Sequence, residues 1–141
     1  MTITQQQART ILDGALKHGA GAGFKPLAVI VLDAGGNVQA FERADGASPG
    51  RFAIAHGKAY GAVMLGMAGT ALMARAEAQP YFVAAANGAF GGQMIPVPGG
   101  VLVKGDAGTV IGAVGVTGDT SDNDAAAALA GIEAAGLKGE I

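Results

Sequence analysis

The sequence has 141 residues, so we expect residues 1–141 to form one domain. It has no cysteine, which excludes disulfides, zinc–thiolate sites, iron–sulfur clusters and a cysteine nucleophile. The net charge is −2 with only 9 basic residues and no basic run, which argues against nucleic acid as a partner. Only 14% of the residues are charged while 50% are hydrophobic, so we expect part of the surface to be buried in a homodimer or a larger homo-oligomer.

The first elements expected along the chain are a helix and a hairpin. Thr4 and Gln7 form a capping box, and the apolar residues after them recur at helical spacing, which predicts a helix over 4–19. The continuous apolar run 27–32 predicts a strand that is buried on both faces. A turn rich in Gly, Asp and Asn then leads into a return strand over 38–43, so the two strands are expected to pair antiparallel.

Two helices, three strands and a last helix are expected next. The expected ranges are helices over 49–67 and 70–79, strands over 93–97, 101–104 and 109–117, and a helix over 122–135 capped by Ser121. Pro80 is expected to end the second of the two helices, and residues 81–90 fit neither a helix nor a strand pattern clearly. Runs of helices that alternate with runs of strands on short turns indicate an α+β fold with antiparallel pairing.

The two histidines are His18 and His56, and each has two interpretations. His18, near the end of the first helix, either caps the last carbonyl groups or ligates haem iron. Phe52, His56 and Tyr60 are spaced four residues apart on the long helix. They form either plain packing or a pocket wall in which an imidazole and a phenol move protons. The histidines do not have the spacing of a metal-ligand cluster, so we predict no separate metal site.

Lys58 lies among alanines on the least polar predicted helix. Its side chain either reaches along the surface to water, or it points into a cleft. In a cleft, the ammonium would bind a carboxylate or a haem propionate, or would act as a base with a lowered pKa.

Four further groups of residues have a structural and a functional interpretation. Arg43 and Asp45, at the end of a predicted strand, form either an anion site or an exposed ion pair. The loop over 88–92, with Gly91 and Gly92, either presents its amides to an oxyanion or only turns the chain. The glycines of 111–118 predict the close approach of another backbone, a subunit or a flat ligand. The acids at positions 119, 122 and 124 would suit a cation, but capping of the last helix explains them better.

Four segments resemble the GlcG/HbpS-like family, which is called haem-binding or haem-degrading and includes the C-terminal domain of PduO-type corrinoid adenosyltransferases. They are VIVLDAGGNVQAFERADGA (29–47), AHGKA (55–59), GGQMIPV (91–97) and IGAVGVTG (111–118), in this order. The resemblance implies a five-stranded antiparallel sheet flanked by helices with a profilin-like layout, which agrees with the α+β fold and the order α-ββ-αα-βββ-α expected from the chain itself. It also implies homo-oligomers. The positions that match family motifs are Arg43, Asp45, Gly46, Lys58, Gly91, Gly92, Gly115 and Gly118.

The main functional hypothesis is a small-molecule-binding protein with haem or another tetrapyrrole as the ligand. Its propionates would lie on Arg43 or Lys58 and its iron on His18, His56 or a hydroxyl group. The alternative is a cofactor-free isomerase, lyase or hydrolase of a catabolic pathway. There, Arg43 and Lys58 would hold a small oxo- or hydroxy-acid, and His56 or Tyr60 would move a proton. A third hypothesis is a non-catalytic accessory subunit.

The N-terminal residues lack the basic start and apolar run of a signal peptide. No uncharged apolar stretch reaches the roughly 18 residues that a membrane-spanning helix needs. We therefore expect a cytoplasmic protein with no membrane partner.

Overall fold

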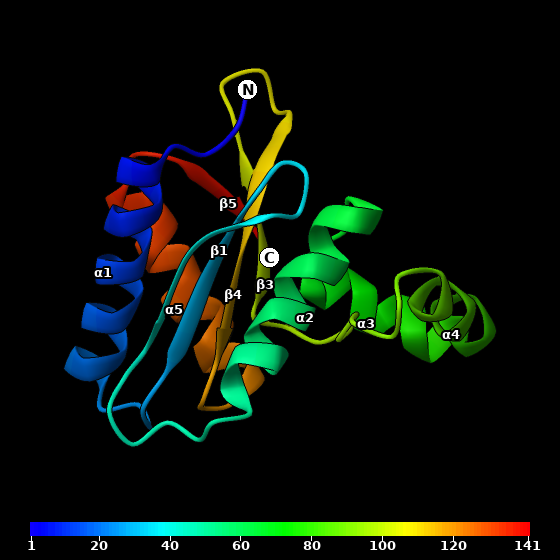
Figure 1. Cartoon of the computed structure of the whole chain (residues 1–141), viewed down its shortest axis with the longest axis horizontal. Helices are drawn as coiled ribbons and strands as arrows, with labels where there is room; N and C mark the ends of the chain where they lie inside the picture. The colour runs from blue at the N-terminus through cyan, green and yellow to red at the C-terminus, as the bar shows by residue number, and fades with distance from the viewer.

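The computed structural model describes residues 1–141 and confirms the α+β fold, with a five-stranded antiparallel sheet flanked by helices (Figure 1). The elements in chain order are α1 (Gln5–Ala22), β1 (Ala28–Asp33), β2 (Val38–Arg43), α2 (Arg51–Leu65), α3 (Gly69–Ala78), α4 (Pro80–Ala89), β3 (Gly100–Lys104), β4 (Val110–Thr117), α5 (Ser121–Ala134) and β5 (Lys138–Glu140). No helix is both long enough and apolar enough to cross a bilayer.

The strand order is β2-β1-β4-β3-β5, so β1 and β4 occupy the interior of the sheet. β1 is buried on both faces, as its continuous apolar sequence predicts, because helices cover both sides of it. It pairs with β2 and with β4, for example through Ile30 opposite Phe41 and Gly115. β2 lies at the edge of the sheet and is more exposed, so its side chains are available to form a surface site.

One face of the sheet carries α1 and α5, which also pack against each other (Figure 1). Ile11 and Ala15 of α1 and Ile132 of α5 are fully buried there. The two helices approach closely because α5 has a glycine at the contact. A Cβ at Gly131 would lie 2.4 Å from the carbonyl oxygen of Ile11.

The opposite face of the sheet carries α2, which contacts it through the alanines Ala55, Ala59 and Ala62. A Cβ at Gly115 of β4 would lie 2.1 Å from the carbonyl oxygen of Ala55. The glycines of 111–118 therefore admit the backbone of another element, which confirms the close approach predicted for this segment. Small residues on both sides fix the position of α2, which carries His56 and Lys58.

α3 and α4 form an arm that projects from the body of the molecule beside α2 (Figure 1). Leu72, Val83 and Met94 form its own small core. The charged groups of this arm lie on α3, because α4 contains no charged residue.

Several predicted boundaries are wrong, and the strand over 93–97 does not form. Its backbone bonds to helices instead: the Ile95 amide donates to the Gly57 carbonyl at 3.0 Å, and the Met94 amide to the Asn87 side chain at 2.8 Å. The fifth strand is β5, which pairs with β3. The order is therefore α-ββ-ααα-ββ-α-β.

The helix ends also differ from the prediction. Pro80 does not only end a helix but begins α4, since proline suits the first helical position, whose amide needs no partner. α1 continues past Gly19 to a left-handed cap at Gly23. Thr120, not Ser121, caps α5, and its hydroxyl accepts the Asn123 amide at 3.2 Å.

Candidate functional site

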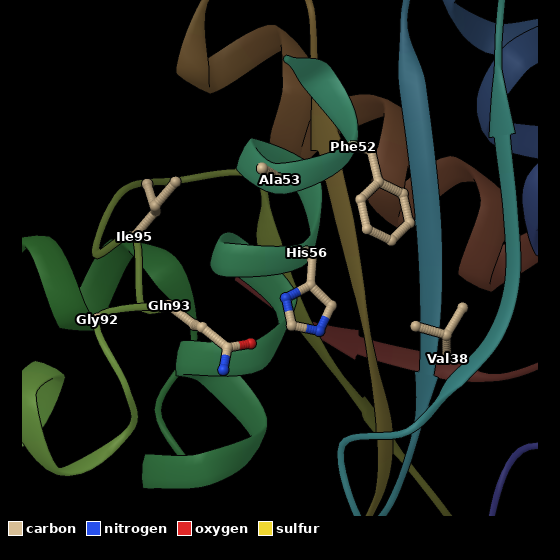
Figure 2. Close-up of a pocket in the computed structure, with 7 residues that line it drawn as sticks. All are labelled: Val38, Phe52, Ala53, His56, Gly92, Gln93 and Ile95. Carbon is tan, nitrogen blue, oxygen red and sulfur yellow. The ribbon is translucent and has the colours of Figure 1, made fainter. Parts of the chain in front are cut away.

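The largest cavity is a cleft of about 470 Å³ between the first turns of α2, the start of β2 and the segment that follows α4 (Figure 2). It is lined by Val38, Phe52, Ala53, His56, Gly92, Gln93 and Ile95. The lining is mostly apolar, and the imidazole is the one titratable group on it. A concave apolar surface with a few polar groups is typical of small-molecule sites.

His56 projects from α2 into this cleft, with Gln93 on one side and Phe52 and Val38 on the other (Figure 2). Its ring stacks between Phe52, at a centroid distance of 6.1 Å, and Tyr60, at 5.2 Å. The three rings lie on one helix face because they are four residues apart. The stacking leaves the nitrogen-bearing edge free, and no protein group hydrogen-bonds either ring nitrogen.

The pKa of His56 is lowered from 6.5 because partial burial disfavours the imidazolium. The neutral imidazole therefore predominates at pH 7. A neutral ring nitrogen is the form that accepts a proton or ligates a metal.

The glycine loop after α4 reaches the cleft through Gly92, whereas Gly91 does not line it. Both glycines have positive φ angles, of 71° and 76°. Their amides are already used: Gly91 donates to the Gly88 carbonyl at 3.2 Å and Gly92 to the Asn87 carbonyl at 2.8 Å. These bonds terminate α4, so the two amides turn the chain and are not free for an oxyanion.

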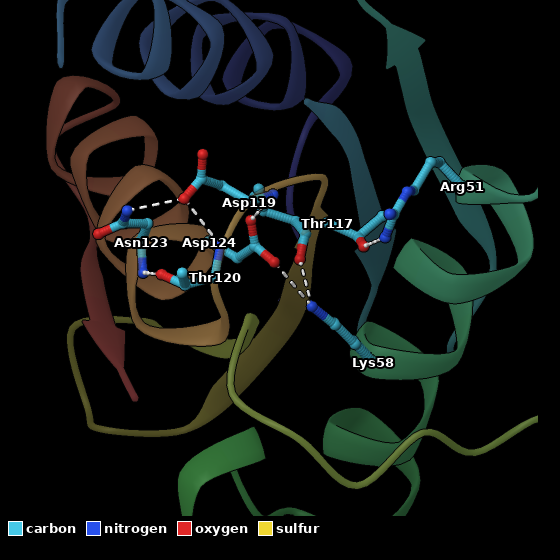
Figure 3. A network of polar contacts seen from close by, with 8 residues as sticks. Arg51, Lys58, Thr117, Asp119, Thr120, Asn123 and Asp124 are labelled. Atoms are coloured by element: carbon cyan, nitrogen blue, oxygen red, sulfur yellow. Dashed lines mark hydrogen bonds and ion pairs between the residues drawn. The ribbon is translucent and has the colours of Figure 1, made fainter. Parts of the chain in front are cut away.

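Lys58 points inward and is only 3% exposed, but it lines no cavity. Its ammonium lies 3.0 Å from a carboxylate oxygen of Asp124 and 3.0 Å from the Val116 carbonyl oxygen (Figure 3). The other oxygen of Asp124 accepts the Asp119 amide at 2.9 Å. This network joins α2 to the start of α5 at the end of β4, and the ammonium faces a carboxylate rather than a ligand cavity.

The surroundings move the pKa values of this pair toward neutral forms. Burial lowers the pKa of Lys58, against the opposing effect of the Asp124 charge. Burial likewise raises the pKa of Asp124, against the hydrogen bonds from Asp119 and Lys58. The pair is therefore a structural element whose stability depends on both partners being present.

Arg43 and Asp45 are exposed at the end of β2 and lie outside the cleft. They form no ion pair with each other. The Arg43 guanidinium donates to the carbonyl oxygen of Ala47 and so holds the loop between β2 and α2.

His18 is exposed on α1, on the opposite side of the sheet from His56. It contacts Phe24 edge-on at 5.7 Å and caps no carbonyl group. One bound molecule therefore cannot contact both histidines within a single chain.

Of the acids near the start of α5, Asp124 pairs with Lys58 and Asp119 accepts hydrogen bonds, whereas Thr120 is the residue that caps the helix. Nowhere do three His, Asp or Glu side chains gather to hold a metal ion. Asp119 accepts three hydrogen bonds: from the amides of Lys25 and Thr120 and from the Asn123 side chain, each at 2.8 Å.

The sequence interpretation missed Val38, Ala53, Gln93 and Ile95 as cleft residues. Gln93 and Ile95 lie in a segment expected to be a strand, which would have placed them within the sheet. The available signal was the pair Pro96 and Pro98, because proline cannot donate to a strand ladder and favours a loop at this position.

Comparisons with known proteins agree with the fold. The family model for haem degrading protein HbpS-like matches residues 3–133. The Klebsiella pneumoniae protein ORFY is 26% identical, with a TM-score of 0.86 over 96% of this chain and 92% of that one. HbpS is 25% identical, with a TM-score of 0.82 over 94% and 89% of the two chains. A PduOC–haem complex, at 22% identity, shares the fold, with a TM-score of 0.85 over 97% of each chain. No curated protein sequence matches significantly.

Proposed function

The chain belongs to the HbpS-like family of haem-degrading proteins, and we propose that it binds haem or a related tetrapyrrole in the cleft beside His56. The observation that carries the proposal is the imidazole itself. It is the one titratable group on the wall of a largely apolar cleft of about 470 Å³, and the protein leaves both of its nitrogens without a partner.

The residues of the cleft fit a haem group in two respects. A neutral imidazole is a common axial ligand of haem iron, and burial keeps His56 in that form. The side chains of Val38, Phe52 and Ile95 offer apolar surface to a flat macrocycle. Bound haem would supply an iron centre, while the stack of Phe52 and Tyr60 holds the orientation of the ligating ring.

The haem propionates are not assigned to Lys58, although we expected them, from the sequence, to lie on Arg43 or Lys58. Its ammonium is buried against Asp124, so a propionate could reach it only by breaking the ion pair. No cation lines the cleft, and the propionates are therefore assigned to the solvent side of the bound group.

Haemin titration tests this proposal. The wild-type protein is expected to shift the Soret band with a saturable stoichiometry, and His56→Ala is expected to abolish or alter that spectrum because the iron loses its axial nitrogen. His18→Ala is the matched control, since its imidazole lies on the far side of the sheet, and its spectrum should equal that of the wild type. Circular dichroism checks that both variants are folded. Identical spectra for His56→Ala and the wild type would refute the assignment.

The cofactor-free enzyme has less support from the geometry. It requires Lys58, His56 and Tyr60 to converge on one substrate, but Lys58 lines no cavity and Tyr60 does not line the cleft. No specific observation favours the accessory subunit. That hypothesis requires no ligand site, and it therefore does not account for the cleft beside His56.

We further propose a homo-oligomer that forms through α4. The exposed residues of this uncharged helix recur with helical periodicity and form one stripe: Pro80, Tyr81, Ala84, Ala85, Gly88 and Ala89. Tyr81 is 71% exposed, and the arm projects from the body of the molecule (Figure 1). Sedimentation should show that Ala85→Arg dissociates the assembly, because an unpaired charge is costly in an interface. A cytoplasmic location stays a prediction.

A further inference from the structure

We propose that a second site, separate from the cleft, binds a small oxyanion of the phosphate class between Lys25 and Arg51. The site is a pocket of about 210 Å³ where the residues before β1, the loop after β2 and the start of α2 meet. It is lined by Lys25, Pro26, Gly46, Ala47, Ser48, Arg51 and Gly118, none of which lines the cleft beside His56.

The charge of this pocket is unusual for a protein with a net charge of −2. Two of its lining residues, Lys25 and Arg51, are cations and none is an acid. Neither cation forms an ion pair, because the ion pairs of the chain join Lys58 to Asp124 and Lys104 to Glu140. The other two polar pockets differ, since each contains Lys104 and Lys138 together with an acid.

The guanidinium of Arg51 is held in place by the protein rather than free in solvent. One of its terminal nitrogens donates to the Thr117 hydroxyl at 2.7 Å, at the end of β4 (Figure 3). The remaining N–H groups of the guanidinium have no protein acceptor. A positioned guanidinium with free donors can bind an oxyanion with little loss of side-chain entropy.

The opposite wall of the pocket is also fixed. The loop that contributes Ala47 and Ser48 is tied down by the bond from Arg43 to the Ala47 carbonyl. The backbone before β1 is anchored because the Lys25 amide donates to Asp119 at 2.8 Å. Asp119 thus accepts the backbone amide of Lys25 and forms no ion pair with its ammonium, although the Lys25 charge contributes to the lowered pKa of Asp119.

These groups match the chemistry of a small multivalent oxyanion. A guanidinium binds two oxygens at once, an ammonium adds a point charge, and the Ser48 hydroxyl adds a donor. α2 begins at Arg51 with no side-chain cap and no acid in its first turn, so its dipole adds to the attraction. The pocket volume suits one phosphate or a short dicarboxylate.

The test is a titration of the full chain with inorganic phosphate at low ionic strength, followed by calorimetry and by backbone amide NMR signals. Binding should saturate and should shift the amide signals of Gly46, Ser48 and Gly118. Lys25→Gln and Arg51→Gln should each weaken binding by about tenfold, the loss expected for one charge-assisted hydrogen bond. Lys25 is exposed, so its variant retains the fold even if Arg51→Gln, which loses the bond to Thr117, is destabilised.

Lys104→Gln is the matched control, because it removes one positive charge elsewhere and should leave phosphate affinity unchanged. A parallel titration with malonate identifies the source of the oxyanion. Tighter phosphate binding supports the phosphate class, whereas equal or tighter malonate binding overturns it in favour of a carboxylate at the same site. The proposal is overturned if neither anion binds saturably, or if Lys25→Gln and Arg51→Gln bind like the wild type.

Discussion

Replacement of Lys58 by methionine is expected to destabilise the protein strongly. The substitution keeps the length of the side chain but removes the ammonium 3.0 Å from Asp124, which is only 1% exposed. The carboxylate would then be buried with a single hydrogen bond, from the Asp119 amide. Removal of one partner of a buried ion pair costs about 3–5 kcal/mol.

This cost converts into a large thermal shift. The unfolding entropy of a chain of 141 residues, at about 2.1 cal/mol/K per residue, gives a fall in Tm of about 10–17 °C. The double variant Lys58→Met/Asp124→Leu should recover most of this loss, because apolar replacement of a buried pair is often neutral or stabilising. The large loss of stability in Lys58→Met therefore comes from leaving Asp124 buried without its partner, and not from the absence of the lysine charge itself.

Thermal and urea unfolding at pH 7, followed by circular dichroism, measure both variants. Lys104→Met is the control, since its 3.5 Å contact with Glu140 is partly exposed and should contribute at most about 1 kcal/mol. The reasoning is refuted if Lys58→Met is no less stable than Lys104→Met, or if the double variant is as unstable as the sum of its two single variants.

Three other outcomes follow from the structure. Haem affinity should be constant above pH 6.5 and should fall only below it, because protons compete with iron for His56 and burial lowers the pKa of this histidine from 6.5. A spectrophotometric pH titration in which half of the haem affinity is lost above pH 6.5 would contradict this. The hydrogen bonds of Asp119 lower its pKa from 3.8 to about 2, so its ionised form stabilises the fold above pH 3.8 and this stabilisation is lost as the pH falls toward 2. In Asp119→Ala, the free energy of unfolding should therefore change less between pH 3.8 and 2 than it does in the wild type. Urea unfolding that shows the same pH dependence for both proteins would exclude this role. Gly115→Ala should destabilise the protein by about 1–3 kcal/mol or more, because the new methyl would lie 2.1 Å from the Ala55 carbonyl oxygen. Gly21→Ala, a helical position with no heavy atom within 4 Å, should instead stabilise it by up to about 1 kcal/mol, and equal effects of the two changes in thermal unfolding would disprove the packing account.

Local patterns in the sequence were sufficient to predict most of the fold. The continuous apolar run 27–32 predicts a strand covered on both faces, and the structure buries β1 in this way. Gly115 and its neighbours predicted the close approach that α2 makes.

The elements that could not be predicted depend on distant partners. β5 is a short strand whose sequence, Lys-Gly-Glu, has no strand pattern of its own and forms only because β3 offers an edge. Residues 93–97 have a strand-like composition, but the amides of Met94 and Ile95 find acceptors on α4 and α2. In both segments, hydrogen bonds to distant elements outweigh the local strand propensity: β5 forms a strand without it, and residues 93–97 form none despite it.

The same distinction explains the candidate sites. The sequence predicted that Lys58 could face inward, and it does, but its partner Asp124 is 66 residues away and no local signal joins the two. His56 was recognised as a candidate because it shares a helix face with Phe52 and Tyr60. The opposite wall of the cleft comes from β2 and from the loop after α4, whose positions only the folded chain defines.

The position of bound haem on the protein distinguishes binding in the cleft from binding near His18. Ferric haem is paramagnetic and broadens the NMR signals of nearby amides, so a titration of the isotope-labelled chain maps its position. Signals of Ala53, His56, Gly92 and Gln93 should broaden first, while those around His18 on α1 stay sharp. Broadening centred on α1, with the cleft signals unaffected, would contradict binding in the cleft.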